Sequence, residues 1–398
     1  MQLEEIRSKV GELMPTATSD LKRLASIPSV AFPGYPPEPV HQAAETTLDV
    51  LTSAGLGDVR MLDIPDGYPA IFGEIPAPPG APTVLFYAHY DVQPSGPESE
   101  WDSPPFEPTL RDGRLYGRGT VDDKAGIVMH AAAVQAFGGD TPVGVKVIIE
   151  GEEETDSHLD EYVGSHPELF AADLVVVADT RNWRRGEPTL TTALRGIATC
   201  SVEVATLEDP VHSGAYGGPA PDALIALIHL LSKLHDERGN VAVPGLESGT
   251  WDGQDQPEEA FRSAAGVLPG VDLIGEGTIS DRLCARPSVS VIGIDAPSVA
   301  ASSNALIPRA RALVSLRLAP GDDARSARRS LARHLEASAP WNVRVTVGEG
   351  QGANGFKATV DGPGYEAARR AMERAYGKQV TLVGEGGSIP LINALSAA

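Results

Sequence analysis

Residues of the types that bind divalent cations stand at or shortly after the ends of three apolar runs. The runs are residues 83–88, 145–149 and 174–178. In chain order, the residues after these runs are His89 with Asp91, Glu153 with Glu154, and Asp179. If the runs are strands of an open α/β sheet, their carboxyl ends form the edge where ligands bind. Imidazole and carboxylate without thiolate are donors for one or two ions such as zinc or manganese. The spacing therefore indicates metal-dependent hydrolysis.

Three motifs carry most of these residues and a further carboxylate, Asp122, and each also has a simpler interpretation. In His89-Tyr-Asp-Val-Gln-Pro94, Asp91 either orients a ligating histidine or forms a turn. In the glycine-rich stretch 117–126, Asp122 either bridges two ions or caps the helix expected from Lys124. In Glu150-Gly-Glu-Glu-Glu-Thr155, dense like charges raise one another's pKa unless a cation neutralises them. That motif can supply one ligand and one free base, and a surface acidic turn is its alternative.

Composition narrows the class of protein. A chain of 398 residues exceeds the usual size of one hydrophobic core, so two domains are expected. The net charge of −22 argues against nucleic acid as a partner, and no apolar run is long enough to cross a membrane. The charged, amphipathic N-terminus lacks the apolar core of a signal peptide. Two cysteines cannot form a disulfide framework, so a cytoplasmic protein is expected.

The elements that must position these residues follow two patterns along the chain. Helices are predicted at residues 3–26, with the spacing interrupted near Pro15, and at 41–54, and strand, loop and helix then alternate to about Asp179. This rhythm predicts an α/β fold with a mostly parallel sheet. Beyond Glu187 the predicted order is β-α-β-β-α-β, typical of an α+β sandwich. Those elements are expected at residues 197–205, 223–234, 288–294, 309–318, 324–337 and 343–347.

A final helix at residues 365–376 and a strand at 379–383 look like a return to the first sheet. We therefore predict a catalytic metal-binding domain of residues 1–187 and 359–398. An inserted α+β lid and dimerisation domain would span residues 188–358. Residues 240–286 are polar and glycine-rich, and they are expected to form an elaborated loop.

Taken as a set, the motifs resemble the M20 family of metallopeptidases. This group contains carnosinase-like dipeptidases, acetylornithine deacetylase and succinyl-diaminopimelate desuccinylase. The resemblance runs from about residue 20 to the C-terminus. It rests on His89-Tyr-Asp91, the stretch 116–124, the acidic run 150–154, Ala178-Asp179, His212-Ser-Gly214 and Gly384-Glu-Gly-Gly-Ser-Ile-Pro390.

The resemblance implies a role for each residue of the metal centre. His89 and Asp179 would hold one ion, Asp122 would bridge, and Glu154 would hold the second ion. Glu153 would be the general base on a metal-bound water, and Asp91 would orient His89. The peptide between Asp122 and Asp123 is expected to be cis. The implied cofactor is two divalent ions per subunit, with zinc first and manganese or cobalt as alternatives.

The resemblance also assigns residues outside the metal centre. The inserted domain would be the family's lid, which mediates homodimerisation, and His212 would reach the neighbouring subunit's site to polarise the scissile carbonyl. Arg309 would bind the substrate's terminal carboxylate, with Arg317 on the same strand as its rival. Gly387 and Ser388 would shape that end of the pocket, and Asn304 is a further candidate.

Two departures from the family pattern stand out. The family's last metal ligand is a histidine near the C-terminus, whereas the final histidine here is His334 and the sequence ends at Ala398. We expect that the natural C-terminus continues further, and a defective second site is the alternative. The segment Asp361-Gly-Pro-Gly364 also lacks a histidine that carnosinase-like members often carry.

The expected function is that of a cytoplasmic, homodimeric di-metal exopeptidase that cleaves the amide bond of dipeptides. Its partner would be a small peptide substrate, with neither nucleic acid nor membrane involved. An N-acyl-amino-acid deacylase with the same site chemistry is the first alternative. A non-catalytic binding protein with an incomplete second metal site is the second.

Overall fold

The computed structural model describes residues 3–155, 157–180, 182–387, 389 and 391–397. It divides the chain into two compact units, residues 1–181 with 391–398 and residues 182–390. The predicted domain boundaries at residues 187 and 359 stay a prediction. Within the described residues, no helix is long and apolar enough to cross a membrane.

The first unit contains six α-helices and seven strands among the described residues. The helices are α1 (Leu3–Ala25), α2 (Glu38–Ser53), α3 (Lys124–Phe137), α4 (Leu159–Ser165), α5 (Pro167–Phe170) and α11 (Leu391–Ala397). The strands are β1 (Gly57–Leu62), β2 (Ala70–Ile75), β3 (Thr83–His89), β4 (Thr109–Arg111), β5 (Arg114–Tyr116), β6 (Gly144–Glu150) and β7 (Leu174–Val177).

Five of these strands form a mixed sheet in the order β1-β2-β6-β3-β7. β3 pairs in parallel with both β6 and β7, whereas β2 pairs antiparallel with β1 and β6. The α/β prediction is confirmed. Within this sheet, parallel pairing is confined to β3, β6 and β7, the three strands that carry the candidate ligands.

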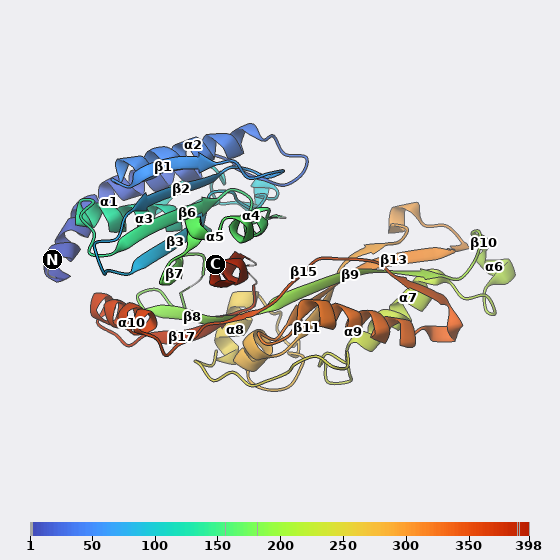
Figure 1. The fold of residues 1–398 in the computed structure, drawn as a ribbon. Coiled ribbons are helices and arrows are strands. Elements are labelled where there is room, and N and C mark those ends of the chain that lie inside the picture. The colour runs from blue at the N-terminus through green and yellow to red at the C-terminus, as the bar shows by residue number, and fades with distance from the viewer. Residues whose placement is uncertain (1–2, 156, 181, 388, 390, 398) are drawn as a thin grey trace. The chain divides into compact units, whose positions relative to one another are not determined.

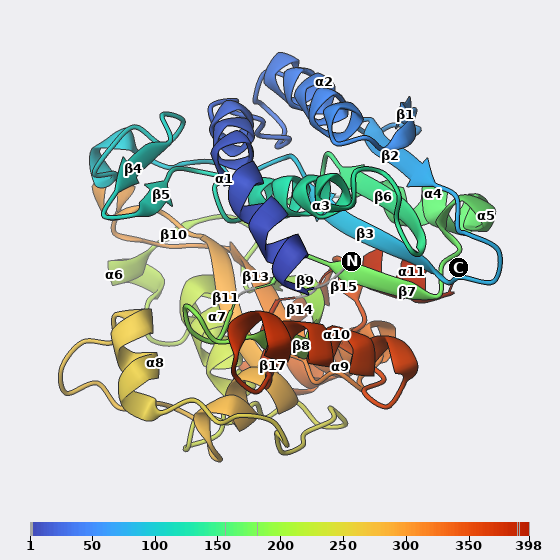
Figure 2. The same cartoon turned by 90° about the vertical axis from the view of Figure 1, so that its left-hand side faces the viewer.

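Alternating side chains of these strands enter two separate cores, one on each face of the sheet. Ala88 and Ile149 pack with residues of α1, α2 and α3, and Tyr87 and Ile148 pack with residues of α4, α5 and α11. Figures 1 and 2 show α1, α2 and α3 together on one side of this sheet. Because both faces are covered, these strands are apolar throughout, and this explains why they appear in the sequence as continuous apolar runs.

Helix α1 runs without a break through Pro15, so the predicted helix is continuous although its apolar spacing is interrupted there. The helix packs along α3, and the buried Lys124 amine of α3 donates to the Leu24 and Ile27 carbonyls at 2.9 and 2.8 Å. These contacts hold the C-terminal end of α1 despite the hydrogen bond that proline cannot donate.

The second unit contains five α-helices and ten strands among the described residues. The helices are α6 (Ser213–Tyr216), α7 (Ala223–Leu231), α8 (Glu258–Ala265), α9 (Ala324–Ala337) and α10 (Pro363–Tyr376). The strands are β8 (Thr189–Leu194), β9 (Gly196–Ala205), β10 (Val211–His212), β11 (Ser288–Asp295), β12 (Ala305–Leu306), β13 (Arg309–Leu318), β14 (Arg344–Val347), β15 (Gly352–Ala353), β16 (Phe356–Lys357) and β17 (Thr381–Glu385).

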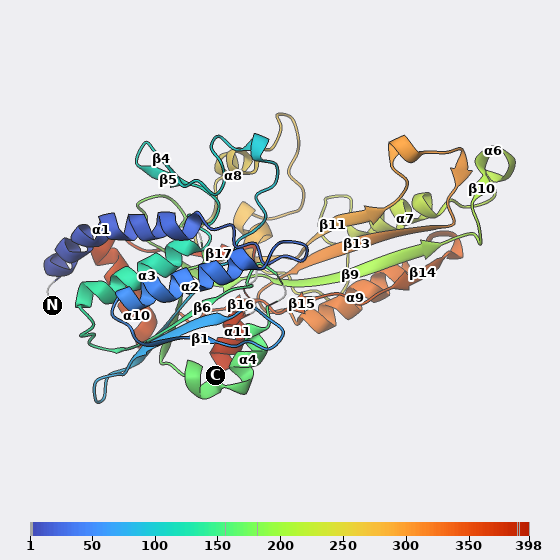
Figure 3. The same cartoon turned by 90° about the horizontal axis from the view of Figure 1, so that it is seen from above.

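The main sheet of this unit has the order β11-β13-β9-β14, with β15 also paired to β9. Figure 3 shows β9 and β13 side by side, and their antiparallel register runs from Arg309 opposite Ala205 to Leu318 opposite Gly196. Helices α7 and α9 pack on these strands through a shared apolar core. Apart from the short elements β10, α6, α8 and β12, the order from β9 to β14 is the predicted β-α-β-β-α-β order.

Two sequence expectations fail in this unit. Strand β17 pairs in parallel with β8, in a separate three-stranded sheet with β16, so it does not return to the first sheet. The segment 240–286 is not only loop, because it includes α8 and a π-helical turn, η3 (Asp281–Ala285). Its few periodic apolar residues gave too weak a signal for these short elements.

Candidate metal centre

The ends of β3, β6 and β7 bring the predicted acidic and imidazole residues together in the first unit. His89 is the last residue of β3 and lies in register with Glu150, the last residue of β6. Asp179 follows β7, which pairs with β3 on its other side. Asp122 and Asp123, joined by the expected cis peptide bond, precede α3.

His89 is fully buried, and carboxylates flank both of its ring nitrogens. Nδ1 lies 3.1 Å from the backbone carbonyl oxygen of Asp91 and 3.3 Å from Oδ1 of the same residue. Nε2 lies 3.1 Å from Asp122 Oδ1, 3.7 Å from Asp179 Oδ1 and 4.0 Å from Glu153 Oε2. With Nδ1 held by Asp91, Nε2 is left as the nitrogen that can bind a cation.

Asp91 holds the acidic turn after β6 as well as the histidine. Its Oδ1 accepts a hydrogen bond from the Glu153 backbone N–H at 3.1 Å, and its Oδ2 accepts one from the Glu154 N–H at 3.0 Å. Asp91 is fully buried, so water does not compete for these bonds. One carboxylate therefore sets the position of His89, Glu153 and Glu154 together.

Two sets of side chains offer ligand atoms within 4.8 Å of one another. The first is His89, Asp122 and Glu154, and the second is His89, Asp123 and Asp179. The structure thus brings together all four residues predicted to hold metal, with His89 in both sets. Asp123, which the sequence analysis gave no ligand role, takes part in the second set.

Asp123 and Gln93 are the site residues that sequence reasoning missed. The Asp123 carboxylate is buried, and its Oδ2 accepts a hydrogen bond from the His89 backbone N–H at 3.3 Å. The Gln93 amide donates to Glu154 Oε2 at 2.6 Å. Both residues stand inside motifs that the sequence analysis quoted, but only the folded arrangement shows where their side chains lie.

Burial and the neighbouring charges shift the pKa values of the residues in this site. The pKa of Glu153 is raised to about 8, chiefly by burial, with His89 opposing the shift and the carboxylates of Asp179 and Glu150 adding to it. Burial also raises the pKa of Glu154, and the hydrogen bond from Gln93 lowers it. Burial lowers the pKa of His89, but hydrogen bonds to Asp122, Asp179 and Asp91 outweigh it and place this pKa well above its usual value.

The donor set fits a divalent cation. Within the described residues, His89 is the only basic side chain that forms an ion pair with Asp122, Glu153 or Asp179. The remaining negative charge is what a bound cation neutralises. Imidazole nitrogen and carboxylate oxygen are both ligands of zinc, and a thiolate is not required.

The predicted lid residues lie in the second unit. His212 ends β10 opposite Ala305 of β12, and its exposed ring accepts a hydrogen bond from the Gly214 N–H at 3.1 Å. Asn304 is next to it, since its carbonyl accepts from the Ser213 N–H at 2.9 Å. Gly387 is exposed beyond β17, and Ser388 lies outside the described residues.

The two candidate arginines of β13 differ in their contacts. Arg309 Nη1 forms an ion pair with Glu203 Oε1 at 3.0 Å, and both side chains are exposed. Arg317 is half-buried and forms no ion pair with any described residue, and burial lowers its pKa. Arg317 thus has the guanidinium that is free to bind an anion.

The chain is similar to proteins of a known family. Residues 85–391 match the model of the peptidase family M20/M25/M40. The chain is 39% identical to a cysteinylglycine-S-conjugate dipeptidase of Corynebacterium striatum, an alignment that covers 88% of this chain and 78% of that protein. It is 30% identical to a β-Ala-His dipeptidase of Homo sapiens, covering 88% of this chain and 74% of the relative.

A solved structure is similar over the whole length. The crystal structure of human carnosine dipeptidase 1 superposes with a TM-score of 0.83 at 27% sequence identity. The match covers 100% of this chain and 90% of the solved one. This chain therefore has the fold of human carnosine dipeptidase 1.

Proposed function

We propose that this chain, which belongs to peptidase family M20/M25/M40 and is a metallopeptidase, cleaves the amide bond of dipeptides. The observation that carries the proposal is the convergence of His89, Asp122, Glu154 and Asp179 beside the half-buried Glu153. Relatives that act on cysteinylglycine conjugates and on β-Ala-His support dipeptides as the substrate class.

The proposed ligand scheme assigns His89 and Asp179 to one ion, Glu154 to the second, and Asp122 to both. Divalent ions held there would polarise the scissile carbonyl and lower the pKa of the attacking water. We propose zinc as the first metal because imidazole is among its preferred ligands, with manganese and cobalt for comparison.

In this scheme Glu153 moves the proton. It takes a proton from the attacking water and then delivers it to the leaving amine. Its carboxylate lies 4.0 Å from His89 Nε2 and is largely buried. It is therefore close to the proposed metal ligands. Asp91 orients His89 and holds the Glu153 backbone, so the base and the first ligand share one support.

For the substrate's free carboxylate we propose an arginine of β13, assisted by Gly387, Ser388 and Asn304. Arg309 is the residue predicted from the sequence, but its pairing with Glu203 favours Arg317. Substitution by methionine separates the two. If Arg317 binds the carboxylate, Arg317→Met should raise KM at least tenfold and Arg309→Met should keep the wild-type KM. If Arg309 binds it, the two results should be exchanged.

We also propose a homodimer formed through the second unit, with His212 serving the neighbouring subunit. β11 is one of the two edge strands of the main sheet, and it exposes Val291, Ile292 and Ile294. Helix α7 exposes Ile225 and Ile228. Unpaired edge strands with apolar side chains are sites of chain association.

We also propose a cytoplasmic location, since Cys200 and Cys284 are free thiols.

A substrate panel tests the function. Dipeptides such as Cys-Gly and β-Ala-His should be hydrolysed with kcat/KM at least tenfold above that for N-acetyl- and N-succinyl-amino acids, in protein loaded with zinc, manganese or cobalt. Hydrolysis of the acyl compounds alone would replace the proposal with a deacylase.

Substitution of Glu153 tests the mechanism. Glu153→Ala should lower kcat by about 10²–10⁴-fold, the usual contribution of a general base. Its metal content should stay near that of the wild type. Glu161→Ala, at an exposed position of α4, is the control and should keep full activity. A Glu153→Ala variant with the wild-type rate would show that another group is the base.

A further inference from the structure

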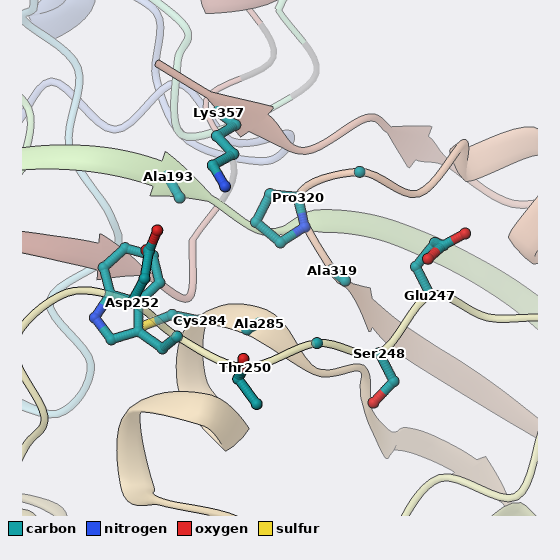
Figure 4. Close-up of a pocket in the computed structure, with 13 residues that line it drawn as sticks. Ala193, Glu247, Ser248, Thr250, Asp252, Cys284, Ala285, Ala319, Pro320 and Lys357 are labelled. Carbon is teal, nitrogen blue, oxygen red and sulfur yellow. The ribbon is translucent and has the colours of Figure 1, made fainter. Parts of the chain in front are cut away.

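A cavity of about 270 Å³ lies within the second unit, and only elements of that unit line it. Ala193 of β8, Lys357 of β16 and Pro320 after β13 form one side, and residues of the segment before β11 form the other. Figure 4 shows the Lys357 side chain extending from its strand toward Ala193 and Pro320. This size is just below the ~300–1,000 Å³ of pockets that hold drug-sized ligands, so a smaller molecule fits.

The charged side chains of this cavity are not paired with one another. Lys357 is a cation, and Asp252 and Glu247 are carboxylates, yet none of the three forms an ion pair with a described residue. The hydroxyls of Ser248 and Thr250 also line the cavity, and they make no hydrogen bond to the described part of the chain. Charges of both signs thus surround one small space and remain available to a ligand.

Close packing and hydrogen bonds hold the part of the wall around Trp251 and Cys284. The Trp251 backbone N–H donates to Asp281 Oδ1 at 2.6 Å, and the Cys284 thiol donates to the Gly384 carbonyl, with Sγ 3.4 Å from the oxygen. A Cβ added at Gly384 would lie 2.7 Å from Cys284 Cβ and 3.1 Å from Trp251 Cη2. Burial raises the pKa of Cys284 to about 11, so the thiol is neutral. These contacts fix the Trp251 and Cys284 side of the cavity.

We propose that this cavity binds a small zwitterion, an α-amino acid or a dipeptide, with its carboxylate at Lys357 and its ammonium group at Asp252. A molecule that carries both charges is the ligand that can make a charge-assisted hydrogen bond to each side chain at once. The Trp251 ring and Cys284 offer an apolar surface for its side chain. The site goes beyond the proposed function, because it involves none of the residues of the metal centre and stands whether or not that centre cleaves dipeptides.

Calorimetric titration of the full chain with L-alanine tests the proposal, with propionate and ethylamine as ligands that carry one charge each. L-Alanine should bind saturably, and each single-charge compound should bind at least tenfold more weakly. Lys357→Gln and Asp252→Asn should each weaken L-alanine binding at least tenfold. Lys378→Gln and Asp272→Asn change exposed residues outside the cavity and should leave binding unchanged.

Each outcome of this experiment has a definite meaning. Absence of L-alanine binding overturns the proposal, as does binding that survives Lys357→Gln, because the amino acid would then sit elsewhere, for example at the metal centre. Equal binding of propionate and L-alanine would also contradict it, since the ammonium contact would contribute nothing. Unchanged thermal unfolding midpoints of Lys357→Gln and Asp252→Asn would show that a loss of binding is not a loss of folding.

Discussion

At the scale of single residues, the ligand types could be predicted from the sequence and the supporting contacts could not. His89, Glu153, Glu154 and Asp179 follow apolar runs that the structure confirms as parts of three strands meeting at one edge. The sequence analysis gave Asp91 only the task of orienting His89. The structure adds its two hydrogen bonds to the acidic turn, which depend on side-chain positions that no spacing rule contains.

Asp91 is therefore expected to matter beyond its contact with His89. Asp91→Asn replaces one acceptor oxygen with an NH₂ group, so one of the N–H groups of Glu153 and Glu154 loses its partner. We expect the variant to lose about 10–100-fold in kcat/KM or metal affinity, as is usual for groups that support metal ligands. Steady-state kinetics and metal titration measure this. Asp63→Asn, at an exposed position after β1, should change neither, and equal values for wild type and Asp91→Asn would refute the supporting role.

At the scale of elements, helix α3 joins the site to the core of the first unit. Its N-terminus follows Asp122 and Asp123, and its His130 lies buried against β3. The imidazole stacks on Phe86 with ring centroids 4.7 Å apart, and Nε2 lies 2.9 Å from the Tyr87 carbonyl oxygen. The sequence analysis could place a helix here from its pattern. It could not show that this histidine faces inward.

The buried His130 is expected to make the fold sensitive to acid. Burial lowers its pKa from 6.5 to about 4, so the unfolded chain binds the proton more readily between those values. The stability that neutral His130 contributes is thus complete above about pH 6.5 and is lost as the pH falls toward 4. Linkage gives a loss of about 2 kcal/mol between pH 8 and pH 5.

Thermal unfolding at both pH values measures this effect. The unfolding midpoint should fall less between pH 8 and pH 5 in His130→Phe than in the wild type, whereas the exposed control His41→Phe should behave like the wild type. The same fall in all three proteins would mean that His130 does not titrate in this range.

At the scale of the whole molecule, the sequence predicted an α/β part and an inserted α+β part, and both occur. It did not predict the partner of β17, because a short apolar run is compatible with either sheet and pairing depends on distant residues. It also could not show which surfaces stay uncovered. Along β11, apolar side chains do not alternate regularly between exposed and buried positions. A register shift between Val291 and Gly293 explains this.

The proposed homodimer depends on that edge strand. Ile292 is 59% exposed on β11, and a lysine there would place a charge in an apolar interface. We expect sedimentation velocity to show a dimer for the wild type and a monomer for Ile292→Lys. The control Leu110→Lys, at a position of β4 that is also 59% exposed, should remain a dimer. A wild-type protein that sediments as a monomer would remove the role proposed for His212.

The most direct test of the account is anomalous diffraction from crystals grown with zinc, recorded on both sides of the zinc absorption edge. We expect two peaks per chain about 3.5–4 Å apart, one of them bonded to His89 Nε2 and Asp179 and the other to Glu154, with Asp122 reaching both. Zinc bound at other residues, with His89 Nε2 still held only by carboxylate oxygens, would contradict it.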